Sequence, residues 1–179
     1  YNSYGHITKT TDANGHSRRY FYNDQQQIAV EVDASGGITQ YHYDTLGQIA
    51  RKVEFEALLP DNSPFSDADG IIDWAISQQG KDRTTVYAYD ARGQVTEERV
   101  VGVTRHTVAS SAIGEGSQAE LVAFEGDHVT QYVYDGAGNM IERAQGMMAR
   151  DGQQWLSDAD VSRVNREYDA LNRVVLEQQ

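Results

Sequence analysis

The sequence has no cysteine and only two prolines among its 179 residues. Without cysteine, neither a disulfide framework nor a cysteine-ligated zinc site can form. The chain also has no apolar run near the roughly 18–20 residues that a membrane-spanning helix requires. We therefore expect no membrane insertion. The missing cysteine leaves an exported, a surface and a cytosolic location all open.

Basic residues are scarce as well: 15 Lys and Arg stand against 27 Asp and Glu, a formal charge of -12. Nucleic-acid binding requires a basic patch that contacts phosphates, so this balance argues against a nucleic-acid partner. The acidic residues are spread along the chain, which favours a role in solubility. Hydrophobic residues make up 39 %, below the usual value of about 45–50 %, and this favours a thin, sheet-like core.

Tyrosine is the feature that recurs. Tyrosine followed by Asp or Asn begins at residues 1, 22, 43, 89, 134 and 168. The first three copies lie at a constant step of 21 residues, and the later steps are longer. Such a step is the signature of a repeat architecture, and the longer steps predict inserts between repeats.

The common frame is Tyr-x-Tyr-Asp-x-x-Gly-x-apolar, and every tyrosine except Tyr4 lies in it. Two copies depart from the frame at the glycine position. Gln26 tolerates a left-handed backbone poorly, so we expect the second turn to take another shape, whereas Asn172 is a mild change. The residues predicted to carry the repeat are Tyr22, Tyr41, Tyr43, Asp44, Gly47, Tyr87, Tyr89, Asp90, Gly93, Tyr132, Tyr134, Asp135, Gly138, Tyr168 and Asp169.

Asp-x-x-Gly is typical of a hairpin turn. The Asp side chain accepts backbone N–H groups within the turn, and Gly at the fourth position takes positive φ without a Cβ clash. The same motif begins at Asp12 and Asp33, midway between tyrosine turns, which leaves strands of roughly 6–7 residues. Alternating residues predict an all-β, antiparallel sheet with the tyrosines on its apolar face and polar residues opposite them: Arg19, Glu31, Gln40 and His42.

We treat residues 1–179 as a single segment, with repeats near 1–55, 81–101, 129–145 and 164–178. The inserts between them, near 56–80, 102–128 and 146–163, should project as loops from one edge of the sheet. The first insert predicts an amphipathic helix near 67–79 that begins after a Ser66 cap and packs on the sheet through Trp74. A second short helix is expected near 117–124.

No catalytic pattern stands out, and we expect neither an enzyme nor a cofactor. The group formed by Asp67, Asp69 and Asp73 lacks the Gly and Glu positions of an EF-hand, so helix capping explains it better. The five histidines show no metal-ligand spacing. An alternative role for the tyrosines is a stacking platform for sugars, although their recurrence in every unit favours a structural role.

With this frame at a 21-residue step, the chain resembles the YD-repeat or Rhs-repeat family. That family includes Rhs polymorphic toxins, the B and C components of insecticidal toxin complexes, wall-associated bacterial proteins and teneurins. The resemblance implies β-hairpins that wind into a shell, which in the toxin members encloses a C-terminal toxic domain. The family's self-cleavage site lies near an Asp-Pro motif, which this sequence lacks, so that part is not carried over.

The resemblance implies a non-catalytic structural segment of a large secreted or bacterial cell-surface protein. Its strands would form part of a β-shell that encloses or displays a C-terminal toxin or other domain, and its partner would be the remainder of the parent chain. The alternative is a carbohydrate-binding or adhesive module that uses exposed aromatics on a cell-surface glycan. Open sheet edges also predict edge-to-edge self-association.

Overall fold

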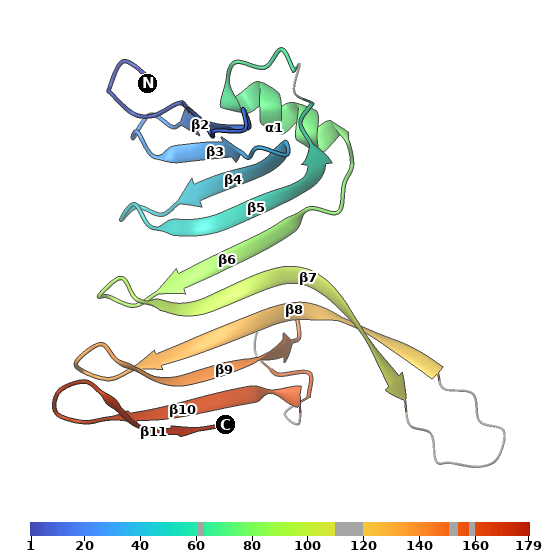
Figure 1. The fold of residues 1–179 in the computed structure, drawn as a ribbon. Helices are drawn as coiled ribbons and strands as arrows, with labels where there is room; N and C mark the ends of the chain where they lie inside the picture. Colours follow the sequence, from blue (N-terminus) through green and yellow to red (C-terminus); the bar gives the residue numbers. More distant parts are fainter. Residues whose placement is uncertain (61–62, 110–119, 151–153, 158–159) are drawn as a thin grey trace. The chain divides into compact units, whose positions relative to one another are not determined.

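The computed structural model describes residues 1–60, 63–109, 120–150, 154–157 and 160–179. It confirms the predicted all-β class: eleven strands follow one another in sequence order, and the described residues contain one helix, α1 (Ala68–Ser77) (Figure 1). The strands are β1 (Lys9–Thr11), β2 (Ser17–Tyr22), β3 (Ile28–Val32), β4 (Gly37–Tyr43), β5 (Ile49–Leu58), β6 (Arg83–Tyr89), β7 (Val95–Ala109), β8 (Glu120–Tyr134), β9 (Met140–Met148), β10 (Ser162–Tyr168) and β11 (Val174–Gln178).

The chain divides into two compact units, Tyr1–Thr85 (unit 1) and Val86–Gln179 (unit 2). In unit 1, β1 to β5 pair antiparallel, each with the next strand along the chain. In unit 2, β7 to β11 do the same. Tight turns join most neighbouring strands, which is the meander expected from a turn every 10–11 residues.

Unit 1 has an aliphatic core covered by the helix. The buried residues of β3 and β4 pack with Ile71 and Ala75 of α1, and Phe65, Ile72 and Trp74 pack partly buried against them. The predicted helix is therefore confirmed. Its closest packing is made by Ile71 and Ala75, since Trp74 is only half-buried and its ring lies 6.3 Å from that of Phe65.

The helix begins one residue later than expected. Its N-cap is Asp67, whose carboxylate accepts the N–H of Gly70 at 2.8 Å, so the prediction of a Ser66 cap is wrong. A carboxylate caps as well as a hydroxyl does and also carries a negative charge at the positive end of the helix dipole. The interpretation of this acidic group as a helix cap is otherwise confirmed.

In unit 2 the second insert is strand rather than loop in its described part. β7 and β8 each have 15 residues and stay paired from Glu97 with Gln131 to Ala109 with Glu120. The helix predicted near 117–124 is therefore wrong for residues 120–124, which belong to β8, and residues 117–119 lie outside the described part. Ladder pairing with β7 outweighs the weak helical preference of this segment.

The third insert returns to the sheet. Trp155 forms an isolated bridge with Met148, and the N–H of Leu156 donates to the carbonyl of Met147 at 2.8 Å. The chain then enters β10, which pairs with β9. Among the described residues, no helix combines the length and apolar character needed to cross a bilayer.

Candidate functional site

The tyrosine turns share one geometry. In the turn that begins at Asp44, the carboxylate accepts the N–H groups of Leu46 and Gln48 at 2.8 and 2.9 Å. Asp12, Asp33, Asp90, Asp135 and Asp169 accept in the same way, at 2.8–3.0 Å. At Asp135, bonds from the side chain and N–H of Asn139 lower the carboxyl pKa below its ordinary value. As predicted, the turn Asp accepts backbone N–H groups within its own turn.

The fourth residue of each turn has positive φ. Gly47 has φ 82°, and Gln26 and Asn172 adopt the same region at 63° and 59°. The prediction that the second turn takes another shape is therefore wrong. Three bonds hold Gln26 there: its own N–H to the Asn23 carbonyl, and two between Asn23 and Gln27 at 2.8 and 2.9 Å. Together they offset a left-handed penalty of about 1–2 kcal/mol.

The second tyrosine of the frame joins one hairpin to the strand before it. Tyr43 donates its hydroxyl to the carbonyl oxygen of Ile28 at 2.9 Å. The same bond joins Tyr22 to Ile7, Tyr134 to Val95 and Tyr168 to Met140, at 2.7–3.0 Å. Each acceptor is the apolar residue five positions after the turn Asp or Asn. We call this bond the tyrosine tie. It was not predicted, because its acceptor is a backbone carbonyl without a side-chain signature.

The first tyrosine of the frame lies on one face of the sheet, and the aliphatic residues lie on the other. Tyr20 is opposite Glu31, and Glu31 is opposite Thr39, so these side chains share the tyrosine face with Tyr41. Val30 is opposite Phe21 and Gln40, which places the buried aliphatic residues on the reverse face. The prediction that tyrosines and aliphatic residues share one apolar face, with Glu31 opposite them, is wrong here. The frame tyrosines in β2, β4, β6, β8 and β10 are half-buried.

Within each unit, an insert packs on the face that the first tyrosine of the frame leaves free. In unit 1, α1 contacts the face of Val30 and Val32. In unit 2, Gly146 is opposite Val129, on the face away from Tyr132. A Cβ at Gly146 would come within 3.2 Å of the Trp155 ring, so that ring lies against this face. The inserts thus supply the second layer that a one-sided sheet requires.

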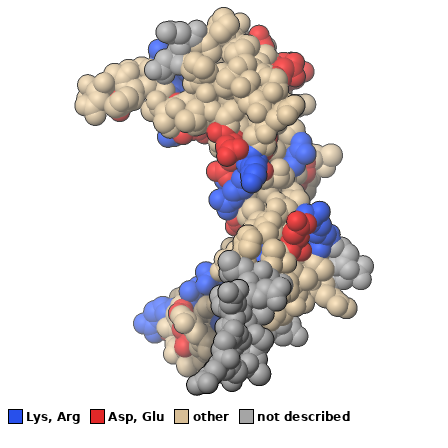
Figure 2. Space-filling view, turned by 90° about the vertical axis from the view of Figure 1, so that its right-hand side faces the viewer, with Lys and Arg blue, Asp and Glu red and all other residues tan. Residues whose placement is uncertain are grey.

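Charges on the tyrosine face of unit 1 are paired. Arg18 bonds Glu31 at 3.1 Å, and Lys52 bonds Glu54 at 3.2 Å. In the face shown in Figure 2, acidic and basic side chains likewise lie next to one another. Burial, followed by the nearby Glu31 carboxylate, raises the pKa of Tyr41 to about 12, and the Tyr41 hydroxyl lies 3.3 Å from that carboxylate.

Successive turns also contact one another through the residue that follows the glycine position. Gln94 donates its amide to the carbonyl of Gly138 at 3.0 Å, and Gln27 donates to that of Gly47 at 3.3 Å. Asn139 donates to the side-chain oxygen of Asn172 at 3.0 Å. These amides and the tyrosine ties are contacts between hairpins, in addition to the backbone ladder.

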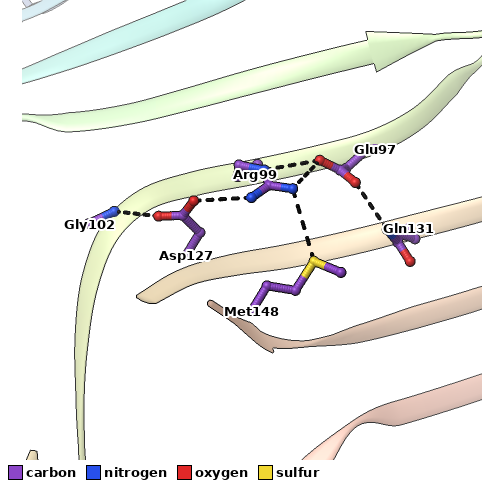
Figure 3. A network of polar contacts seen from close by, with 6 residues as sticks. All are labelled: Glu97, Arg99, Gly102, Asp127, Gln131 and Met148. Carbon is purple, nitrogen blue, oxygen red and sulfur yellow. Dashed lines mark hydrogen bonds and ion pairs between the residues drawn. The ribbon is translucent and has the colours of Figure 1, made fainter. Parts of the chain in front are cut away.

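A partly buried ionic network lies where the long hairpin bends (Figure 3). Arg99 bonds Glu97 at 2.8 Å and Asp127 at 3.1 Å, and the other oxygen of Asp127 accepts the N–H of Gly102 at 3.0 Å. Glu97 also accepts the Gln131 amide at 3.0 Å. The pairing shifts register here, so one extra β7 residue is accommodated next to Gly102, which has φ 70°. Asp127, only 4 % exposed, therefore satisfies the N–H that the bulge removes from the ladder.

The sequence offered no motif for this network, because its members lie apart along the chain and partly in a predicted insert. Nothing in it resembles a nucleophile with its base. Among the described residues, no group of His, Asp and Glu side chains is arranged to hold a metal ion. The arrangement of the repeat residues is therefore one that joins hairpins, and nothing in it points to catalysis.

A family model and two solved structures are similar to this chain. The family model described as RHS Repeat matches residues 1–38. Two solved structures are similar: the crystal structure of TcdB2-TccC3-Cdc42, at 14 % identity and a TM-score of 0.32, and that of TcdB2-TccC3-TEV, at 14 % and 0.33. The alignments cover 90 % and 95 % of this chain and 9 % of each of those chains.

This chain thus spans less than a tenth of those similar chains, and no curated protein matches it. The family match falls on the uninterrupted part of the array, where the tyrosine step is constant. The recognition made from the tyrosine–aspartate frame is confirmed over residues 1–38, which match the RHS Repeat model.

Proposed function

We propose that this chain is a non-catalytic structural segment of a large exported RHS-repeat protein. Its strands form part of a β-shell that encloses or displays a C-terminal toxin or other domain, at the cell surface or after secretion. The rest of the parent chain is its partner. The observation that carries the proposal is the tyrosine tie, because the residues that define the repeat use their polar groups to join one hairpin to the next.

Side-chain bonds between successive hairpins, such as the tyrosine tie, suit a continuous β-shell. The turns and the buried face already favour one register, and a side-chain bond to one particular carbonyl adds to that preference. The hydroxyls of Tyr22, Tyr43, Tyr134 and Tyr168 already donate their protons within the fold in this way. Enclosure of another domain is the family's implication, and it requires a direct test.

Electron cryo-microscopy of the complete polypeptide that contains this sequence tests the shell. We expect the strands of residues 1–179 to be continuous with a β-wall around another domain. If residues 1–179 instead form a separate lobe that is not continuous with a β-wall, the proposal is overturned.

Sugar binding is tested on the 179-residue chain by a glycan array and titration calorimetry. We expect no saturable binding. Saturable binding that is lost in Tyr41→Ala or Tyr132→Ala and kept in Tyr4→Ala would show instead that the tyrosine face is an adhesive surface. Tyr4 is a suitable control because it is the tyrosine outside the repeat frame.

A further inference from the structure

Asn14 and Gly15 form the sole Asn-Gly pair of the sequence, and they lie at the tip of the turn that joins β1 to β2. Both residues are exposed. Gly15 has φ 89°, and a Cβ built on it would meet no atom within 4 Å, so no side chain shields its nitrogen. The side-chain amide carbon of Asn14 therefore has an unhindered backbone nitrogen as its neighbour.

The side-chain amide of Asn14 is also free to rotate. Among the described residues it bonds no other group, and only the backbone N–H of Asn14 is engaged, with the Asp12 carboxylate at 2.9 Å. At Asn23 and Asn139, in two of the tyrosine turns, the amide nitrogen donates to another side chain at 3.1 and 2.9 Å. Those bonds hold the amide in place, whereas the Asn14 side chain can turn toward the nitrogen that follows it.

We propose that Asn14 is a modification site, at which the folded chain deamidates without an enzyme and forms isoaspartate. The backbone nitrogen of Gly15 attacks the side-chain amide carbon of Asn14 and forms a C–N bond. The side-chain nitrogen leaves as ammonia and carries away the proton that the Gly15 nitrogen gives up. The product is a five-membered cyclic imide.

Water then opens the imide at one of its two carbonyl carbons. Cleavage of the bond between the Gly15 nitrogen and the side-chain carbon gives aspartate. Cleavage of the bond between the same nitrogen and the backbone carbon of residue 14 gives isoaspartate. Water is the only co-reactant, and no oxidation or reduction takes place. The inference is independent of the proposed function, because it concerns the chemistry of one turn.

One hydrogen bond opposes closure of the ring. The N–H of Gly15 donates to the carbonyl of Asp12 at 3.1 Å and must leave it before the attack. A single exposed hydrogen bond contributes little net stability, so a loop tip opens locally while the sheet stays folded. Loop tips are also where tolerance to covalent change is greatest.

Isoaspartate lengthens the backbone of this turn by one carbon atom. The Asp12 carboxylate accepts the N–H groups of Asn14 and His16, each at 2.9 Å, and both bonds depend on the spacing of the backbone between them. β1 has three residues, all exposed, and a two-stranded hairpin is marginally stable by itself. The modification should therefore loosen β1 from β2 and leave the pairing of β2 with β3 intact.

The test incubates the full 179-residue chain in mildly alkaline buffer and maps its peptides by mass spectrometry. We expect Asn14 to lose its amide and to yield both aspartate and isoaspartate, while Asn23 and Asn139 keep their amides. Asn14→Gln is the matched control, since its longer side chain disfavours the imide ring, and it should stay unmodified. Amide hydrogen exchange should become faster in residues 9–11 of the isoaspartate fraction and stay unchanged in the incubated Asn14→Gln chain.

Each part of the proposal has a result that overturns it. An Asn14 amide that lasts as long as those of Asn23 and Asn139 would remove the site, and this comparison does not depend on how the variant folds. Aspartate without isoaspartate would exclude the imide. Unchanged exchange of β1 in the isoaspartate fraction would show that the new linkage does not loosen the hairpin.

Discussion

The Tyr43 hydroxyl reaches the Ile28 carbonyl, fifteen residues earlier in the chain, and it does so from the last residue of β4. The first prediction concerns this bond. Tyr43→Phe should lower the free energy of unfolding by about 0.5–1.5 kcal/mol, because it deletes one hydrogen bond and leaves a carbonyl without a donor. Urea unfolding measures the change. Tyr4→Phe, at an exposed ring outside the frame, is the matched control and should leave the midpoint unchanged. Equal loss in both variants would contradict the role of the tie.

A second prediction concerns the left-handed turn residue Gln26. Gln26→Gly should raise the free energy of unfolding by up to about 1 kcal/mol, since glycine relieves the cost of positive φ and loses some of that gain through its more flexible unfolded chain. Gly47→Ala should move the other way by about 1–2 kcal/mol, because Gly47 has φ 82° in the equivalent turn. Thermal unfolding of the two variants compares them. A destabilised Gln26→Gly would show that the glutamine side chain does more than occupy the turn.

The third prediction separates the two faces of α1. Ile71 is 0 % exposed in the core of unit 1, and Ile76 on the same helix is 59 % exposed. Ile71→Ala should therefore cost about 2–5 kcal/mol through lost burial and the cavity left behind, whereas Ile76→Ala should change stability by less than about 0.5 kcal/mol. Chemical denaturation followed by Trp74 fluorescence reports on this helix. Similar losses in the two variants would mean that the helix does not pack as described.

The fourth prediction concerns the network at the bend of the long hairpin. Asp127→Ala should cost about 3 kcal/mol, because it leaves Arg99 with Glu97 alone and orphans the N–H of Gly102. Asp127→Asn retains an acceptor for that N–H and should cost less. Glu125→Gln is the control, since the Glu125–Arg150 pair lies on the surface and such pairs contribute little. Equal stabilities of Asp127→Ala and Glu125→Gln would contradict a stabilising role for Asp127 in this network.

The fifth prediction is a loss of stability at alkaline pH. The Tyr41 pKa is raised from 10.0 to about 12, chiefly by burial and then by the Glu31 carboxylate. The fold favours the neutral phenol, so this stabilisation is present below pH 10 and disappears as the pH rises toward about 12. Tyr41→Phe should therefore lose less stability over that interval than the unmodified chain. Tyrosinate absorbance gives the titration, and a Tyr41 pKa at its ordinary value would contradict the prediction.

Much of the fold follows from local sequence rules. The turn Asp and Gly residues act over four or five positions, so their spacing alone predicts the hairpins and the antiparallel class. Gln26 shows the limit of such rules, because its intrinsic preference is outweighed by its own bond to Asn23 and by the bonds between Asn23 and Gln27. The segment from 120 to 124 was wrongly predicted as helix for a similar reason, since pairing with β7 decides its conformation.

The contacts between hairpins were not predictable in the same way. A tyrosine tie joins a hydroxyl to a backbone carbonyl, and any residue type can supply a carbonyl. Asp127 bonds Gly102 and Arg99, which lie 25 and 28 residues earlier in the chain. The N–H of Gly102 lacks a partner in the ladder only because of the bulge in β7. The two faces of the sheet also required the cross-strand register, which alternation within single strands does not contain.

The tie has a direction along the chain. In every case described, the carbonyl belongs to the earlier residue and the hydroxyl to the later one. A polypeptide leaving a ribosome or a translocation channel N-terminus first therefore presents each acceptor before its donor. The carbonyl acceptor is therefore already in place when each new hairpin forms. The hairpins can assemble one after another from the N-terminus, and the first repeats can be joined before the last one has emerged.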